Sequence, residues 1–391
     1  MDIAFHYFAV KTLAVMAGFT DDEAQIIAVN SQLVDDFDYT AYWHCTNVPD
    51  YIKNNPNYDM CVFGGLFNPV QTGFLCDGWL GRTDYLYLAL YRGQRFTCAP
   101  FHFIYQESEQ VVKKEYRVVS VLDNNDAVIS DMLIEARDQF CGATVGTRKW
   151  RKALMKIGML LHIFADTVAH QMFSGFNANV NLVDLKNVKN NIDDSDETEK
   201  YQSTTIKFLQ QLKEWAPGAT MAIGHMMLEH IPDLTHLTFT FKYKDENNED
   251  QYYTRDNTAE FVDISRRILD YLRSCLGREE ISDEDWGDIA QKLKCSFLTD
   301  ISEDTNEEKM VEHLKSAWNY EGCTYYYNSE EIKDSFSQVT QPLEETVVLD
   351  GIPEELKPVA STKASEDFYL FNMNADEVLI ALYGPHPRRL W

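Results

Sequence analysis

The chain has 391 residues, 45% of them hydrophobic, and its formal net charge at pH 7 is −27. Its length and apolar content suffice for one large domain or two smaller ones. The strong negative charge disfavours a protein that coats duplex DNA, because binding to phosphates is largely electrostatic. An enzyme with a locally positive site stays compatible with these numbers, since a bound metal ion supplies its own charge.

The sequence shows no targeting or membrane-spanning segment. Its first residues lack a basic stretch followed by an apolar run and a cleavage site, and no run of roughly 20 apolar residues occurs. We therefore expect no signal peptide, no stable membrane insertion and a cytoplasmic location. The eight cysteines are scattered without a CxxC pair, so free thiols are expected and a cysteine zinc site is not.

The first part of the chain is predicted to be mainly helical. Residues 3–17 are apolar with a helical period, and Thr20 with Glu23 forms a capping box that predicts a second helix over 21–35. Residues 44–82 are rich in Asn, Pro, Gly and aromatic residues and are expected to form a long packed loop.

The middle of the chain is expected to add further helices around one polar loop. The polar and charged residues 185–202 predict a solvated loop. The helical predictions are a short helix over 83–94, helices over 122–141 and 147–173, and a helix over 214–233 that ends at Pro232.

The pattern changes after residue 236. Residues 237–257 alternate apolar and polar side chains around an acidic turn, which predicts a β-hairpin. Helices over 258–276, 284–297 and near 375–383 are expected to follow. We therefore expect a mainly α protein in two parts: a helical metal-binding core over 1–236, and a β-hairpin with an α+β C-terminal region over 237–391 packed on it.

One apolar segment carries three metal-capable side chains at intervals of four residues, namely His162, Asp166 and His170. In a helix this spacing places all three on one face, and the apolar residues around them indicate that the face is buried. Buried ionisable groups are rare unless they are paired or ligated. Zinc binds imidazole nitrogens and carboxylate oxygens, so the segment predicts a metal site.

Further candidate ligands lie in similarly apolar surroundings. His6 and His102 are flanked by aromatic residues, and two adjacent carboxylates end the predicted second helix. His225 and Glu229 are four residues apart, so they share a face of the predicted helix over 214–233. Two or three zinc ions held by such a set clamp the attacking and leaving oxygens of a phosphodiester. The adjacent carboxylates are Asp35 and Asp36.

Read along the chain, these residues follow the order H…D…H…HxxxD…H…HxxxE. This order resembles the zinc-dependent phospholipase C and single-strand nuclease superfamily, all-α enzymes with a trinuclear zinc site. The blocks MDIAFHYF, SQLVDD, PFHF and HIFADTVAHQMFSGF also look like an uncharacterised bacterial family, over roughly residues 1–240. The resemblance implies these metal ligands: His6, Asp35 or Asp36, His102, His162, Asp166, His170, His225 and Glu229.

The resemblance also suggests an N-terminal ligand. In the resembled enzymes the amine and carbonyl of an N-terminal tryptophan bind zinc, and Met1 lies at a matching distance before His6. Either the Met1 amine or the Asp2 carboxylate takes that place. Only three residues separate Asp166 from the next histidine, fewer than in those enzymes, so two or three zinc ions are both compatible with the sequence.

The resemblance implies a zinc-dependent phosphoesterase in which Asp166 bridges two ions. Whichever of Asp35 and Asp36 does not bind metal orients the attacking water as general base. Expected substrates are a small phosphodiester, a lipid headgroup or a short single-stranded nucleic acid, and the sequence leaves the oligomeric state open. The alternative is a non-catalytic helical protein with a structural metal or a buried polar network, acting within an assembly. A di-iron protein is disfavoured, because the two Glu-x-x-His motifs of such bundles are missing.

Overall fold

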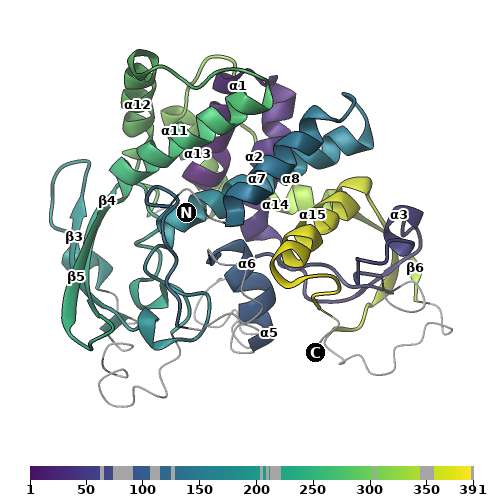
Figure 1. The fold of residues 1–391 in the computed structure, drawn as a ribbon, viewed down its shortest axis with the longest axis horizontal. Coiled ribbons are helices and arrows are strands. Elements are labelled where there is room, and N and C mark those ends of the chain that lie inside the picture. The colour runs from purple at the N-terminus through teal and green to yellow at the C-terminus, as the bar shows by residue number, and fades with distance from the viewer. Residues whose placement is uncertain are drawn as a thin grey trace.

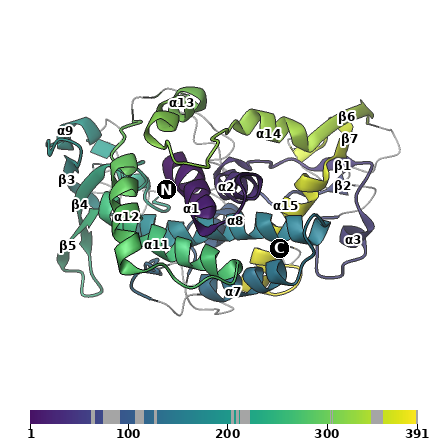
Figure 2. The same cartoon turned by 90° about the horizontal axis from the view of Figure 1, so that it is seen from above.

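The computed structural model describes residues 1–61, 66–73, 91–105, 115–124, 128–202, 206–207, 211, 222–302, 304, 306–343 and 356–388. Among these residues, 51% are in helices and 13% in strands, and the strands form a four-stranded and a three-stranded sheet. The prediction of a mainly α fold is therefore wrong, and the protein has a mixed α/β fold. Helices lie between the two sheets, which occupy opposite ends of the molecule (Figures 1 and 2).

The N-terminal helices form as the sequence predicts. A π-helical turn, η1 (Ala4–Ala9), continues into α1 (Val10–Ala17), and α2 spans Asp21–Asp36. The capping box is confirmed, because the Thr20 hydroxyl accepts from the Glu23 amide and the Glu23 carboxylate accepts from the Thr20 amide. This reciprocal pair satisfies two amides that a helix start leaves unpaired.

The long helix α8 (Arg148–Ala169) is the central element, with α2 and α7 (Val128–Cys141) packed against it. Residues 122–124 and 170–173, which were predicted as parts of these helices, lie outside them. Helix α2 approaches α8 closely at Gly158, where an added Cβ would lie 2.1 Å from the carbonyl oxygen of Ile27. The absence of a side chain at Gly158 thus sets the spacing of two helices that carry site residues.

Replacing Gly158 with alanine should lower the free energy of unfolding by about 1–3 kcal/mol, because the new methyl group meets backbone atoms that cannot move aside cheaply. Helix propensity alone favours alanine by about 1 kcal/mol, so a stabilised variant would contradict the close approach. Urea unfolding measures the change. Gly287→Ala in α12 (Asp283–Phe297) is the matched control: among the described residues no atom crowds that position, and stabilisation is expected.

The three-stranded sheet has the order β3-β4-β5 and is antiparallel throughout. The predicted hairpin is confirmed as β4 (Leu237–Lys244) and β5 (Asp250–Asp256). The predicted solvated loop over 185–202 is wrong, because it contributes β3 (Asp184–Asn190) and the short helix α9 (Thr198–Tyr201). The apolar residues of β3 are buried while its lysines face outward, so the strand looked polar in sequence.

The four-stranded sheet joins distant parts of the chain in the order β2-β1-β7-β6. Strand β1 (Trp43–Cys45) pairs antiparallel with β2 (Leu66–Phe67) and parallel with β7 (Ala360–Ala364). The edge strand β6 spans Ser337–Pro342. The predicted loop over 44–82 thus contributes two strands and the helical turn α3 (Asp50–Lys53). These strands were not predicted, because two or three residues give no recognisable alternation.

The C-terminal region is mainly helical and shares the core of the N-terminal helices. α11 (Asn257–Cys275) and α12 confirm two predicted helices, and α15 (Glu366–Tyr383) is longer than predicted. α13 (Glu307–Ala317) and α14 (Ser329–Phe336) were not predicted. The predicted boundary after residue 236 falls at the start of β4, and one apolar cluster contains residues from both sides of it.

The predicted short helix over 83–94 lies largely outside the described residues, with α5 (Tyr91–Gly93) and the π-helical turn η3 (Gln94–Cys98) at its end. None of the helices in the described part of the chain combines the length and the apolar character that a membrane span requires.

Candidate metal centre

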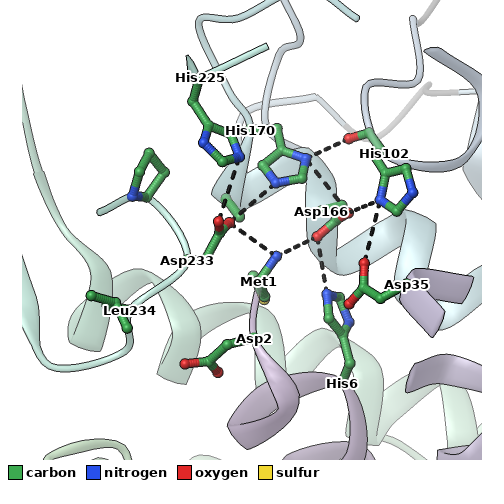
Figure 3. Close-up of polar contacts among 12 residues, drawn as sticks. Met1, Asp2, His6, Asp35, His102, Asp166, His170, His225, Asp233 and Leu234 are labelled. Carbon is green, nitrogen blue, oxygen red and sulfur yellow. Dashed lines mark hydrogen bonds and ion pairs between the residues drawn. The ribbon is translucent and has the colours of Figure 1, made fainter. Parts of the chain in front are cut away.

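Seven of the predicted side-chain ligands meet where α2 and α8 approach the N-terminus of the chain, and one of them, His225, lies on a turn (Figure 3). η1 carries His6, the last turn of α2 carries Asp35, and α8 carries His162 and Asp166. His170 is the C-cap residue of α8, and His102 directly follows the short helix α6 (Ala99–Phe101). The four histidines other than His225 are at most 5% exposed.

Asp166 lies at the centre of the cluster and is 1% exposed. Its Oδ1 atom is 2.7 Å from the Met1 amine and 3.1 Å from His6 Nε2. Its Oδ2 atom is 3.2 Å from His102 Nδ1 and 3.1 Å from His162 Nε2. One carboxylate therefore faces two sets of nitrogens, one with each oxygen, as a bridging ligand does.

The charges around Asp166 are unevenly balanced. Burial acts to raise the pKa of Asp166, but His170 and the Met1 amine, with other nearby histidines, hold it well below its usual range. Burial acts to lower the pKa of the Met1 amine, and the carboxylates around it raise that pKa to about 11. Burial also holds the pKa of Asp35 well above its usual range. The negative charges of Asp166 and Asp36 add to this effect on the pKa of Asp35, while His102 and the Met1 amine oppose it.

The first group of possible metal ligands consists of His6, His162 and Asp166, and a second group consists of Asp35, His102 and His162. Asp35 Oδ1 lies 3.6 Å from His102 Nδ1 and 3.7 Å from His162 Nε2. The neighbouring Asp36 is directed elsewhere, because its carboxylate accepts a hydrogen bond from the Tyr327 hydroxyl. Of the two carboxylates that the sequence left open, Asp35 is the one that faces the cluster.

The third group consists of His170, His225 and Asp233. Asp233 Oδ1 lies 3.2 Å from His170 Nε2, and Asp233 Oδ2 lies 3.5 Å from His225 Nε2. Asp233 also approaches the Met1 amine at 3.3 Å, so this group adjoins the first one (Figure 3). The three groups each bring their ligand atoms within 4.8 Å of one another.

The predicted helix over 214–233 is wrong where the structure describes it. Residues 222–233 form turns and the single 3₁₀ turn η6 (Met226–Leu228), with positive φ angles at Gly224 and Glu229. Spacing by four residues therefore does not place the Glu229 carboxylate beside His225. His225 instead contacts the backbone carbonyl of Glu229, and the carboxylate that faces its ring is that of Asp233.

Three histidines each place one ring nitrogen against a backbone carbonyl. His102 Nε2 is 2.8 Å from the Thr72 oxygen, His170 Nδ1 is 2.6 Å from the His102 oxygen, and His225 Nδ1 is 2.6 Å from the Glu229 oxygen. Because a carbonyl only accepts, each of these nitrogens donates its proton, and in a neutral ring the other nitrogen turns a lone pair to the cluster. Backbone carbonyls commonly orient metal-binding histidines in this way.

The nitrogens that face the cluster point at other acceptors. His170 Nε2 faces Asp233, and His162 Nε2 lies 3.3 Å from His102 Nδ1. Burial lowers the pKa of His162 and of His225 to about 4, so both rings are neutral at pH 7. His162 Nε2 can donate a proton to Asp166 or to His102 Nδ1, depending on its tautomer. Burial acts to lower the pKa of His102, but Asp166 and Asp35 raise it above its ordinary value. Neutral imidazoles with ionised carboxylates are the donor set that a divalent metal requires.

Asp2 lies beside the cluster but outside these three groups. Its Oδ1 atom accepts from the Ala4 amide at 3.0 Å, near the start of η1, and its carboxylate points away from Asp166 (Figure 3). Burial raises the pKa of Asp2 to about 7. Of the two N-terminal groups that the sequence left open, the Met1 amine is the one within the cluster.

Sequence reasoning missed Asp233. A usable signal was present, because helices usually end at or before the residue that precedes a proline, so Pro232 indicates that Asp233 lies in the connection to the following strand. The predicted helix over 214–233 instead makes Asp233 its last residue. The Thr72 and His102 carbonyls that orient neighbouring rings carry no signal in sequence, since every residue has a carbonyl.

The fold and the cluster define a mixed α/β protein with a buried centre of histidines and aspartates. The chain belongs to a family of unknown function (DUF6765), whose family model matches residues 1–382. No curated protein and no solved structure matches the chain.

Proposed function

We propose that the protein is a metal-dependent phosphoesterase with two or three zinc ions in this centre. The observation that carries the proposal is that the three groups are continuous: His162 belongs to two of them, and Asp166 has close contacts to nitrogens on both sides. His6, Asp166 and, when deprotonated, the Met1 amine would hold the first ion, and Asp166 would also serve the second ion, because its other oxygen faces His102 and His162. Asp35, His102 and His162 complete the second site, and His170, His225 and Asp233 hold the third ion.

Zinc in such a centre supplies Lewis acidity toward a water molecule and toward the oxygens of a phosphodiester. Asp35 has the side chain most open to solvent among the three carboxylates, at 31% against 12% for Asp233 and 1% for Asp166. This exposure supports the proposal that Asp35 meets an entering substrate and accepts a proton from the attacking water. Asp36, engaged by Tyr327, has no direct role in this proposal.

The proposed substrates share a phosphodiester group, as in a small diester, a lipid headgroup or a short single-stranded nucleic acid. The net charge of −27 disfavours long polynucleotides, because their phosphates would be repelled by most of the surface. A small substrate with one or two phosphates encounters mainly the local field of the metal ions.

Elemental analysis tests the metal centre directly. Protein produced with added zinc should hold two or three zinc ions per chain, and hydrolysis of bis(p-nitrophenyl) phosphate should disappear after chelation and return with zinc. A single ion that supports no hydrolysis would contradict the phosphoesterase. Protein free of metal after growth with zinc, cobalt or manganese would contradict the metal centre itself.

A second candidate is a non-catalytic protein whose cluster is a polar network. The Met1 amine favours it, because this buried ammonium group already lies between Asp166 and Asp233 and balances part of their charge. In that case the thermal unfolding midpoint is the same with zinc and with chelator. A metal centre predicts a fall on chelation, because zinc bound to the folded state stabilises it.

A further inference from the structure

Arg255, the second-last residue of β5, is buried at 1% exposure although it carries a charge. Within the described part of the chain no carboxylate forms an ion pair with it. Its guanidinium group donates instead to neutral oxygens and lies 4.9 Å from the ring centre of Phe239. Removing a cation from water without an anionic partner is costly, so the hydrogen bonds that it makes require an explanation.

One side of the guanidinium group binds the end of α8. Its Nη1 atom lies 2.8 Å from the Val168 oxygen and 2.5 Å from the Ala169 oxygen. These are among the last carbonyls of the helix, which have no partners inside it and form the negative end of its dipole. Arg255 therefore fixes the helix end at the residue directly before His170.

The other side of the group binds the loop that carries Asp233. Its Nη2 atom lies 2.5 Å from the Pro232 oxygen, and its Nε atom donates to Asn257 Oδ1 at 2.7 Å. The Asn257 side-chain amide in turn donates to the Ile231 and Leu234 oxygens, at 3.0 and 2.7 Å. Arg255 and its hydrogen-bond partner Asn257 thus bind the backbone carbonyls directly before and after Asp233.

We propose that Arg255 is a positioning residue that sets the distance between His170 and Asp233, by binding the backbone next to each of them. The expected effect on the third metal ion rests on the proposed function. The hydrogen bonds of Arg255 to the two backbone segments do not depend on that function. The rigid fork of an arginine reaches both segments at once, whereas the single ammonium group of a lysine does not. The β-hairpin that supplies Arg255 is therefore part of how the centre is built.

The test compares Arg255→Lys with a matched control, Arg267→Lys. Arg267 in α11 also donates to two backbone carbonyls, those of Val121 and Leu122, and touches none of the three groups. The measurements are zinc affinity and content, the thermal midpoint, and hydrogen exchange of the peptides that cover residues 170–173 and 229–236. A further variant, Arg255→Ala, is measured with and without millimolar guanidinium, which fits the space that the side chain leaves.

Arg255→Lys is expected to bind the zinc ion of the third group about 10–100-fold less tightly than the wild type does. This is the loss seen for other residues that orient metal ligands. The other ions stay bound, and Arg267→Lys keeps the full complement even if its thermal midpoint falls equally. Guanidinium, but not methylammonium, restores the third ion to Arg255→Ala. Unchanged zinc affinity in Arg255→Lys would overturn the proposal. So would a loss of all zinc ions in both Arg255→Lys and Arg267→Lys that accompanies their unfolding.

If the wild-type protein binds no metal, the proposed function fails while Arg255 is still tested. Hydrogen exchange in metal-free protein should then rise in both peptides of Arg255→Lys, and guanidinium should reverse the rise in Arg255→Ala. Equal exchange in wild type and variant would show that Arg255 does not hold these segments.

Discussion

Replacing Asp166 with asparagine should remove at least two zinc ions and lower phosphodiester hydrolysis by more than about 1,000-fold. Asparagine has nearly the same shape but lacks the charge, and only one of its two terminal atoms accepts a hydrogen bond. Each oxygen of Asp166 faces two nitrogens within 3.2 Å, so one substitution affects the ligands on both sides. Metal analysis and single-substrate kinetics measure the two effects.

Asp36→Asn is the matched control for this experiment. Asp36 is adjacent to the site residue Asp35, yet it accepts from Tyr327 and belongs to none of the three groups. We expect this variant to keep its zinc. If Asp166→Asn keeps full metal content and activity, the centre is assigned to the wrong residues. If it loses only stability, by about 3–5 kcal/mol, the cluster is a buried ionic network rather than a metal site.

The sequence predicts most of the cluster because buried polar residues are conspicuous in apolar segments. His162 and Asp166 were found from their spacing alone, and the structure confirms that they share a face of α8. His170 was expected inside the helix, but it lies at the C-cap, and its position depends on the backbone contacts of the preceding turn. The choice between Asp35 and Asp36 could not be made, since adjacent residues at a helix end differ only in which partner approaches them.

The fold was harder to predict than the site, because the missing elements depend on contacts between distant segments. Strand β1 has three residues, and its parallel partner β7 lies more than 300 residues further along the chain. Neither segment shows a strand pattern, and pairing across such a separation leaves no local signal. The predicted hairpin, β4 with β5, is confirmed because its alternation and its acidic turn are local.

The carboxylates of Asp233 and Glu229 give the clearest difference between the structure and the sequence pattern, because only Asp233 belongs to the third group. Asp233→Asn should remove one zinc ion and lower kcat/KM by at least about 100-fold, because the Asp233 carboxylate faces both His170 and His225. Glu229→Gln should change kcat/KM by less than about twofold, the size expected for a substitution away from the site. This substitution keeps the backbone carbonyl that accepts from His225 Nδ1.

Measuring both variants in one experiment decides between the two geometries. If Glu229 were the ligand, residues 225–229 would form a helical turn, and Glu229→Gln would lose the metal while Asp233→Asn kept it. That reversed result would contradict the loop conformation as well as the ligand. Loss of metal in Asp233→Asn alone would show that this ligand comes from the turn after Pro232 rather than from the helical face predicted for residues 225–229.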